Sequence, residues 1–384
     1  MKKKILFTKS LLLLLMFVSC THEETPSKRI NFDDAKDSKV QELFSKIKLI
    51  SLRDNGKTFL PDVSTLDVYD DYMLVSDKNS ILYLFSRDGN CISNSKDKFG
   101  HGEGEYSIIT AYTFNPYSKS IEIITPTDLL IFDIHFKLQK KIPVPTKFSS
   151  TGEGFVFYGK IYDLSASTHL LIPTGISEDC HRICVFDSEK KEIVKTLSYG
   201  EDVLTNVTMQ AGCFFPIQDN SLLFCPPCIT NYIYSFDKNS LTLNKLYYTE
   251  FGNNGLSASD VNQFGSNIER EQEFLLKCEK SMPAKTMYAN NCILFTVKES
   301  NHIRKWHTLM YNMNTQELSS IKNYGDKGIQ FPIILSVNKN SMYSAVETSQ
   351  LQSLLEPFGE NVDKTDFDSN SGENDYVIVE YIIR

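Results

Sequence analysis

The chain has 384 residues, and 41% of them are hydrophobic, with 25 phenylalanines and 19 tyrosines, which is enough to build a packed core. It carries 48 acidic and 40 basic residues, for a net charge of −8. An acidic chain without clustered basic residues is poorly suited to nucleic acid, because neutralising phosphates takes grouped lysines and arginines. We therefore expect no nucleic-acid partner.

Residues 1–19 are predicted to be a signal peptide that is removed from the mature protein. Four lysines precede the apolar run 11–18. This run is too short to span a membrane, since a spanning helix needs about 20 apolar residues. A basic start, a short apolar run and a small residue before the cleavage point are typical of export signals. No other run in the chain is long and apolar enough to span.

Cys20 directly follows the predicted signal peptide. The segment "FVSC" resembles the lipobox of bacterial lipoproteins, although Phe17 stands where leucine is usual. The resemblance implies that Cys20 is lipidated, and two or more acyl chains anchor a protein stably. An ordinary signal peptide followed by an incidental cysteine is the alternative. The expected location is the bacterial outer membrane, held through the lipidated N-terminus.

Residues 20–39 are predicted to be a flexible tether between the lipid and the folded domain. The segment is polar, and Ile30, Phe32 and Ala35 are its apolar residues. Glu23 and Glu24 resemble the acidic signal that directs Bacteroidetes lipoproteins to the cell surface, and generic tether acidity is the other interpretation. Without residues 1–19 the net charge falls to about −12.

Five stretches between residues 71 and 318 share one order of features. Each has an apolar strand, a polar turn, a second strand that ends in an aromatic residue, and then another turn and strand. The alternating pattern and the many aromatic and β-branched residues favour strands over helices. The five aromatic residues are Phe85, Phe132, Phe186, Phe236 and Tyr311, and they lie 47, 54, 50 and 75 residues apart. A sixth, weaker unit begins with "NSMYSAV" and ends with "DYVIVEYIIR".

This repeat predicts an all-β fold, a six-bladed β-propeller over residues 40–384. One unit cannot bury both faces of its sheet, whereas units arranged around an axis bury every face and leave short edges. Six units of about 50 residues fit six blades. The strand "KIKLISLRD" at 46–54 is expected in the same blade as the C-terminal strand, because that pairing removes the open edge between first and last blades.

Three segments carry a family resemblance. They are "DDYMLVSDKNSILYLFSRDGN", "KFGHGEGEY" and "NDYVIVEYIIR". They are similar to the six-bladed β-propeller lipoproteins of Bacteroides and relatives, an NHL-like group, over nearly the whole of 40–384. In the second segment Glu103 stands where the family often has proline. The resemblance implies a fold and a location, and it does not assign an activity.

The glycine-rich segment "GHGEGEY" lies on a loop between predicted blades. It lacks the lysine of a phosphate-binding loop, and its glutamates would repel phosphate. Its glycines are suited to a turn with positive φ. Because loops carry function on rigid scaffolds, His101, Glu105 and Tyr106 are candidate ligand-binding residues.

Cys225 and Cys228 form a Cys-x-x-Cys pair in the fourth unit. A redox pair needs a lowered thiol pKa, typically at a helix N-terminus, but here a strand follows and two prolines intervene. A structural disulfide, or two free thiols, is the preferred interpretation. With Cys180, His181 and Cys184 of the preceding unit the pair could also supply zinc ligands. Eight cysteines besides Cys20 leave the connectivity open.

Two segments depart from the repeat. "SNIEREQEFLLKCEK" predicts a short helix, with Ser266 as N-cap and Glu269 completing a capping box. Ile268, Leu275 and Cys278 fall near one face, so the helix should pack on the propeller as a structural cap or as a lid. "DFDSNSGEND" at 366–375 is similar to a calcium loop but lacks its glycine and glutamate, which favours a solvated acidic loop.

The sequence shows no nucleophile elbow and no His-Glu-x-x-His motif. We therefore expect a non-catalytic protein, without a metal or cofactor, that binds a partner protein or a small ligand at one end of the central channel. The alternative is an NHL-like, metal-dependent hydrolase or lyase that acts in that channel. Three or more His, Asp or Glu side chains converging near the axis would favour the alternative.

Overall fold

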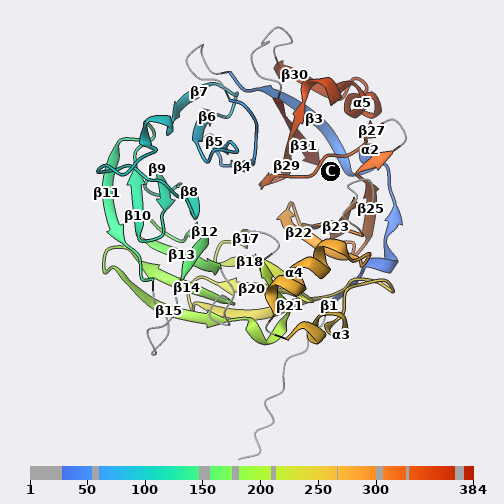
Figure 1. Ribbon diagram of the computed structural model, residues 1–384. Helices are drawn as coiled ribbons and strands as arrows, with labels where there is room; N and C mark the ends of the chain where they lie inside the picture. Colours follow the sequence, from blue (N-terminus) through green and yellow to red (C-terminus); the bar gives the residue numbers. More distant parts are fainter. Residues whose placement is uncertain are drawn as a thin grey trace, which may run out of the picture.

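The computed structural model describes residues 28–53, 60–146, 156–174, 181–208, 213–265, 267–299, 306–325, 328–367 and 376–384. Six largely antiparallel sheets stand around a central axis, as Figure 1 shows, so the chain is a six-bladed β-propeller as predicted. Clusters of buried hydrophobic residues fill the space between adjacent sheets. Burying both faces of each sheet in this way is the reason for the ring.

Blades 1 to 3 follow the chain directly, each from its inner to its outer strand. Blade 1 contains β4 (Thr65–Val68), β5 (Tyr72–Ser76), β6 (Leu82–Ser86) and β7 (Cys91–Asn94). Blade 2 contains β8 (Ala111–Asn115), β9 (Ser120–Ile124), β10 (Asp128–Phe132) and β11 (Leu138–Pro143). Blade 3 contains β12 (Phe157–Asp163), β13 (Thr168–Thr174), β14 (Arg182–Asp187) and β15 (Glu192–Ser198).

Blades 4 to 6 each include a strand from elsewhere in the sequence. Blade 4 contains β17 (Cys213–Gln218), β18 (Ser221–Cys225), β20 (Tyr232–Asp237), β21 (Thr242–Glu250) and β1 (Lys28–Asn31). Blade 5 contains β22 (Met282–Ala289), β23 (Cys292–Lys298), β24 (Trp306–Asn312), β25 (Leu318–Lys322) and β2 (Lys36–Asp37). Blade 6 contains β28 (Ser336–Asn338), β29 (Ser341–Glu347), β31 (Tyr376–Ile383), β3 (Phe44–Ser51) and β30 (Val362–Asp366).

The aromatic residues that defined the repeat occupy equivalent places. Each lies on the third strand of its blade, from β6 in blade 1 to β24 in blade 5, and each is buried; they are Phe85, Phe132, Phe186, Phe236 and Tyr311. The large aromatic side chain on the third strand packs into the space between its own sheet and the neighbouring sheet. The sequence period therefore reports a packing position that recurs in five of the blades.

Strand β3 closes the ring as predicted. It pairs antiparallel with the C-terminal strand β31, with Ile47 opposite Tyr381 and Leu49 opposite Val379. The first strand of the predicted domain 40–384 and the C-terminal strand thus share blade 6. The pairing satisfies backbone groups of β31 that would otherwise form an open edge.

The predicted tether 20–39 is wrong in its second half. Strand β1 pairs in parallel with β21, and β2 pairs in parallel with β25, on the outer edges of blades 4 and 5. Ile30 and Phe32 are buried in the core between these blades. The few apolar residues of this polar segment are thus enough to hold it against two sheet edges. Strand β1 begins at residue 28, and the signal peptide, Cys20 and the acidic pair lie outside the described residues.

The predicted helix is present as α4 (Ile268–Lys277) and packs on the propeller. Its N-cap is Asn267, whose side chain accepts a hydrogen bond from the amide of Arg270; the predicted cap, Ser266, lies outside the described residues. Leu275 is buried in the core, and Lys298 of blade 5 donates to its carbonyl at 2.9 Å. Lys298 thus supplies a hydrogen-bond donor to a carbonyl in the last turn of α4, where the backbone carbonyls have no partner within the helix.

The remaining elements are short. They are α2 (Val40–Leu43), α3 (Ala258–Val261), α5 (Leu351–Leu355), β16 (Val203–Thr208), β19 (Cys228–Thr230), β26 (Tyr324–Gly325) and β27 (Gly328–Ile329). Strands β16 and β19 pair with each other, and so do β26 and β27. Within the described ranges, no helix has the length and apolar character needed to cross a membrane.

Candidate functional site

A cavity of about 1160 Å³ lies at the centre of the ring. The innermost strand of every blade contributes to its wall: β4, β8, β12, β17, β22 and β28. The hairpins after β4, β8 and β28 line it as well. The cavity therefore follows from the propeller fold, because the six innermost strands face one another across it.

Blades 1 to 3 supply a polar wall. Asp67 on β4 and Lys160 on β12 form an ion pair at 3.6 Å. The hydroxyl of Tyr112 bonds that of Thr65, and burial raises the pKa of Tyr112 to about 12. This part of the wall thus offers a paired carboxylate and ammonium, together with phenols and hydroxyls that stay neutral at physiological pH.

Blades 4 to 6 supply a more apolar wall. Phe215 and Pro216 lie on β17, Met287 lies on β22, and Leu335 and Val337 lie at or on β28. Lys285 on β22 donates to two backbone carbonyls beside β28, at 2.8 and 3.2 Å. The cavity is therefore amphipathic, with its hydrogen-bonding groups concentrated on one side.

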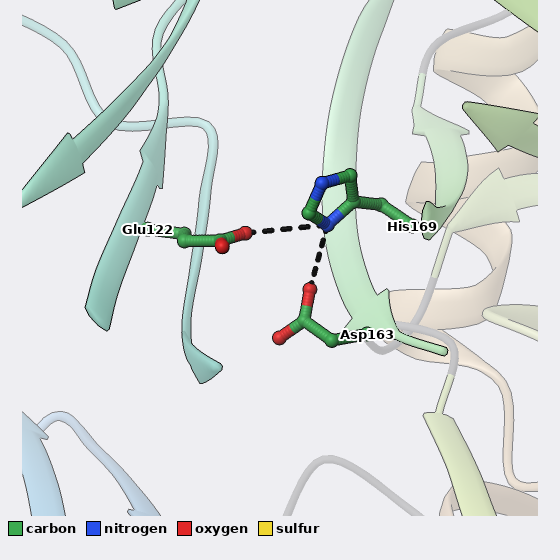
Figure 2. Close-up of side chains that lie close together, drawn as sticks. All are labelled: Glu122, Asp163 and His169. Carbon is green, nitrogen blue, oxygen red and sulfur yellow. Dashed lines mark hydrogen bonds and ion pairs between the residues drawn. The ribbon is translucent and has the colours of Figure 1, made fainter. Parts of the chain in front are cut away.

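Three titratable side chains converge between blades 2 and 3: Glu122, Asp163 and His169. Glu122 lies on β9, Asp163 ends β12, and His169 lies on β13 directly opposite Asp163 in the register. Nδ1 of His169 is 2.8 Å from Oδ1 of Asp163 and 3.3 Å from Oε2 of Glu122 (Figure 2). The side chains of Glu122 and His169 are fully buried, while Asp163 borders the central cavity.

Burial governs the protonation of this cluster. Desolvation, followed by the nearby charge of Asp163, raises the pKa of Glu122 to about 8. Desolvation likewise raises the pKa of Asp163 to about 7, and it lowers the pKa of His169. Without a bound cation, neutral forms are favoured because an uncompensated charge is costly in a buried site.

The candidate ligand residues on the "GHGEGEY" loop lie away from the cavity wall. Tyr106 is buried and donates to the hydroxyl of Ser95, so it serves the core between blades 1 and 2. The carboxylate of Glu105 accepts from the amide of Gly102 at 2.8 Å and so stabilises its own turn. His101 is exposed. The structure thus gives two of the three residues a structural role, and ligand contact at His101 stays a prediction.

Of the two alternatives for Cys225 and Cys228, the possible disulfide is not formed in the structure, where Cys228 is a free thiol. Cys225 ends β18 and Cys228 begins β19, so the pair spans a bend between two strands instead of starting a helix. Burial raises the pKa of Cys228 to about 12, which leaves too little thiolate for redox chemistry. The geometry agrees with the preference for a structural role.

The proposed zinc ligands of blades 3 and 4 do not converge in the described part of the chain, where the cluster of Glu122, Asp163 and His169 is the group with metal-ligand spacing. Cys180 lies outside the described residues. In the acidic segment 366–375, Asp366 ends β30 and forms an ion pair with Lys48 on β3 at 2.5 Å, while 368–375 lie outside the described residues.

Sequence reasoning missed the cluster, because no motif links Glu122, Asp163 and His169 along the chain. One signal was present: Glu122 interrupts the apolar strand "SIEII", every residue of which is buried. A carboxylate inside such a strand needs a partner, and that requirement could have directed attention to a histidine in the next unit.

The profile of a family described as a domain of unknown function (DUF4934) matches residues 27–379. Among curated proteins, none matches the chain. Two solved structures share its fold. A candidate exported protein of Bacteroides fragilis is 12% identical, with a TM-score of 0.68 over 93% of this chain and 99% of that one. A DUF4221 member from Bacteroides vulgatus is 10% identical, with a TM-score of 0.52 over 88% and 98% of the two chains.

At these identities the two neighbours show the fold alone. The six-bladed propeller implied by the resemblance is confirmed, and structural neighbours do come from Bacteroides. The NHL-like relationship and the lipid anchor stay predictions.

Proposed function

The chain belongs to the DUF4934 family, and we propose that this member binds a small organic molecule in its central cavity without transforming it. The cavity itself supports this proposal, since all six inner strands build its wall. Small-molecule sites typically occupy about 300 to 1,000 Å³ and are mostly apolar with a few placed polar groups. A volume of about 1160 Å³ is slightly above that range.

The two walls indicate the chemistry of the ligand. Blades 1 to 3 present Asp67, Lys160 and neutral hydroxyls, whereas blades 4 to 6 present Phe215 and Met287. A ligand with a hydrogen-bonding edge and an apolar face would satisfy both. Asp67 and Lys160 compensate each other in their ion pair, which favours an uncharged polar ligand over an ion at that part of the wall.

The burial of the Glu122, Asp163 and His169 cluster favours binding over the metal-dependent hydrolase or lyase. A catalytic metal needs an open coordination position that substrate can reach. Glu122 and His169 are fully buried, and Asp163 alone borders the cavity. The cluster therefore meets the criterion of three converging side chains, but it lies between two blades instead of in the channel.

Binding in the cavity is expected to fail when the cavity is filled. The probe is 4-nitrophenyl β-D-glucopyranoside, which has a hydroxylated ring and an apolar ring. We expect it to bind the wild-type protein in isothermal titration calorimetry, and Ala284→Trp on the cavity wall to weaken the affinity at least about tenfold by steric exclusion.

Val194→Trp on the exposed face of β15 is the matched control and should bind as the wild type does. Undiminished binding by the Ala284→Trp variant would place the probe outside the cavity. Release of 4-nitrophenol would contradict binding without catalysis.

We also propose that Cys20 carries the lipid that holds the protein on the outer membrane. Strand β1 begins at residue 28, which is eight positions after Cys20. Eight residues reach at most about 30 Å even when fully extended, so the propeller would stay close to the membrane surface.

Replacing Cys20 with serine is expected to move the protein from the membrane fraction to the soluble fraction and to abolish labelling by a radioactive fatty acid. Cys91→Ser on β7 is the control and should remain in the membrane fraction. Membrane retention of the Cys20→Ser variant would rule out a lipid anchor at this position.

A further inference from the structure

We propose that Glu122, Asp163 and His169 bind a divalent cation of the Zn²⁺ class between blades 2 and 3. Asp163 also borders the proposed ligand cavity, but neither proposal requires the other. Glu122 belongs to blade 2, whereas Asp163 and His169 belong to blade 3, so a shared ion would join one blade to the next.

The spacing of the three side chains suits a metal ion. Their potential ligand atoms all lie within 4.8 Å of one another. Zinc binds nitrogen and oxygen at about 2.0 to 2.2 Å in tetrahedral geometry, which places neighbouring ligand atoms about 3.3 to 3.6 Å apart. Nδ1 of His169 is 2.8 Å from Asp163 and 3.3 Å from Glu122, so a small outward movement of one carboxylate would admit the ion.

Charge gives a second reason. Both carboxylates are buried, and His169 is the basic group that forms ion pairs with them in the described part of the chain. Two ionised carboxylates beside one imidazole leave negative charge in a low-dielectric site, which is strongly unfavourable unless it is compensated. A divalent cation would compensate both carboxylates at once.

Unsatisfied acceptors give a third, independent reason. Oε1 of Glu122 accepts from the side-chain amide of Asn115 at 2.9 Å. Its other oxygen, Oε2, lies 3.3 Å from Nδ1 of His169, and neither Oε2 nor Oδ2 of Asp163 has a hydrogen bond of good geometry among the described residues. Buried acceptors are rarely left unpaired, so these two oxygens mark a missing partner. Asn115 would act as the outer residue that orients a metal-bound carboxylate.

The chemical types of the three ligand groups indicate which metal ion would bind. One imidazole nitrogen with two carboxylates suits zinc or manganese, whereas calcium prefers about six to eight oxygen ligands. For a given nitrogen and oxygen site, zinc is bound more tightly than manganese. Asp163 borders the central cavity and so gives the ion a path of entry.

The same junction already contains a direct contact between the blades. Asn115 of blade 2 donates to the carbonyl of Ser165, in the hairpin between β12 and β13 of blade 3, at 3.1 Å. Burial of Glu122 and His169 leaves little room for substrate at an ion held there. We therefore assign the ion a structural role, in which it fixes the positions of blades 2 and 3 and the cavity wall between them.

The test uses the full-length protein, purified without a polyhistidine tag, stripped of metal with EDTA and titrated with ZnCl₂. We expect one equivalent of Zn²⁺ per chain and a rise in Tm of roughly 5 °C when zinc is about 100-fold above its Kd. MnCl₂ should bind more weakly, and CaCl₂ and MgCl₂ should leave Tm unchanged at the same concentration.

Glu122→Gln keeps the shape of the side chain and an oxygen for Asn115 but removes the charge. We expect this variant to bind Zn²⁺ at least about tenfold more weakly. His307→Gln, which alters a histidine beside Glu299 in blade 5, is the matched control and should bind as the wild type does. Equal zinc affinity in the Glu122→Gln variant and the wild type would overturn the proposal.

Zinc K-edge absorption on the wild-type protein keeps the test decisive even when a variant fails to fold. We expect a first shell of nitrogen and oxygen with the scattering of one imidazole. Sulfur in that shell would instead indicate cysteine ligands and would overturn the assignment. Failure of the stripped wild-type protein to bind zinc at all would overturn it as well, and would mean that the two carboxylates share protons.

Discussion

Replacing Leu49 with alanine is expected to lower the free energy of unfolding by about 3 kcal/mol. Leu49 lies in the middle of β3, opposite Val379 of β31, and its side chain is completely buried. Truncation leaves a cavity in the core between blades 4, 5 and 6, which adds to the lost burial of the side chain. Because β3 is the strand that closes the ring, the whole propeller should lose stability, and the measurement is guanidinium unfolding followed by far-UV circular dichroism.

The matched control for Leu49 is Val194→Ala on β15, an aliphatic truncation on an outer strand where the side chain is 44% exposed. We expect it to change stability by less than about 0.5 kcal/mol. A similar small change for Leu49→Ala would contradict the importance of the closing strand. A separate early transition for blade 6 would show that closure does not couple the blades.

The part of the fold that could be predicted is the part that repeats. In five units an aromatic residue ends the second strand of the sequence pattern, and the structure puts all five on the third strand of a blade. The strand at 46–54 was recognisable because a ring needs its first and last strands to pair. Both inferences depend on periodicity and on the burial of sheet faces, which a single sequence does reveal.

The strands that were missed are those with no pattern of their own. Strand β30 reads "VDKTD" and has one apolar residue, yet it pairs in parallel with β3. Two ion pairs support it, Lys46 with Asp363 at 2.7 Å and Lys48 with Asp366 at 2.5 Å. Such edge strands form because they pair with a neighbouring strand, so the β propensity of their own residues does not identify them.

The candidate site could not be predicted for a related reason. Glu122 and His169 are on different blades, and their meeting depends on how two neighbouring sheets are offset. The predicted site residues His101, Glu105 and Tyr106 are close in sequence, but Tyr106 turns into the core while His101 remains exposed. Proximity along the chain was therefore a poor guide, and a charge inside an apolar strand would have been a better one.

Replacing Glu380 with alanine is expected to lower the free energy of unfolding by about 3 kcal/mol. Glu380 on β31 accepts a hydrogen bond from the hydroxyl of Tyr343 at 2.6 Å. Arg87 of blade 1 donates to the same hydroxyl at 2.7 Å and lies 3.6 Å from the carboxylate of Glu380. Burial raises the pKa of Tyr343 to about 12, so the phenol keeps the proton that it donates.

This network joins blades 1 and 6, the junction at which the ring closes. Without Glu380 the hydroxyl of Tyr343 loses its acceptor and Arg87 loses its ionic partner in a partly buried position. The exposed pair of Glu273 and Lys277 on α4 provides the control, because Glu273→Ala should cost less than about 0.5 kcal/mol. Chemical denaturation of the variants at neutral pH measures both losses.

The double variant Arg87→Ala/Glu380→Ala distinguishes the attraction between these two side chains from the energetic cost of leaving Arg87 without its ionic partner. Nη1 of Arg87 is buried and has no hydrogen-bond partner among the described residues, so the guanidinium is incompletely satisfied even in the wild type. Removing it together with Glu380 should cost less than the sum of the two single changes, by about 1 kcal/mol or more. Simple additivity would mean that Arg87 and Glu380 stabilise the closing junction independently and that their ion pair adds no coupling energy.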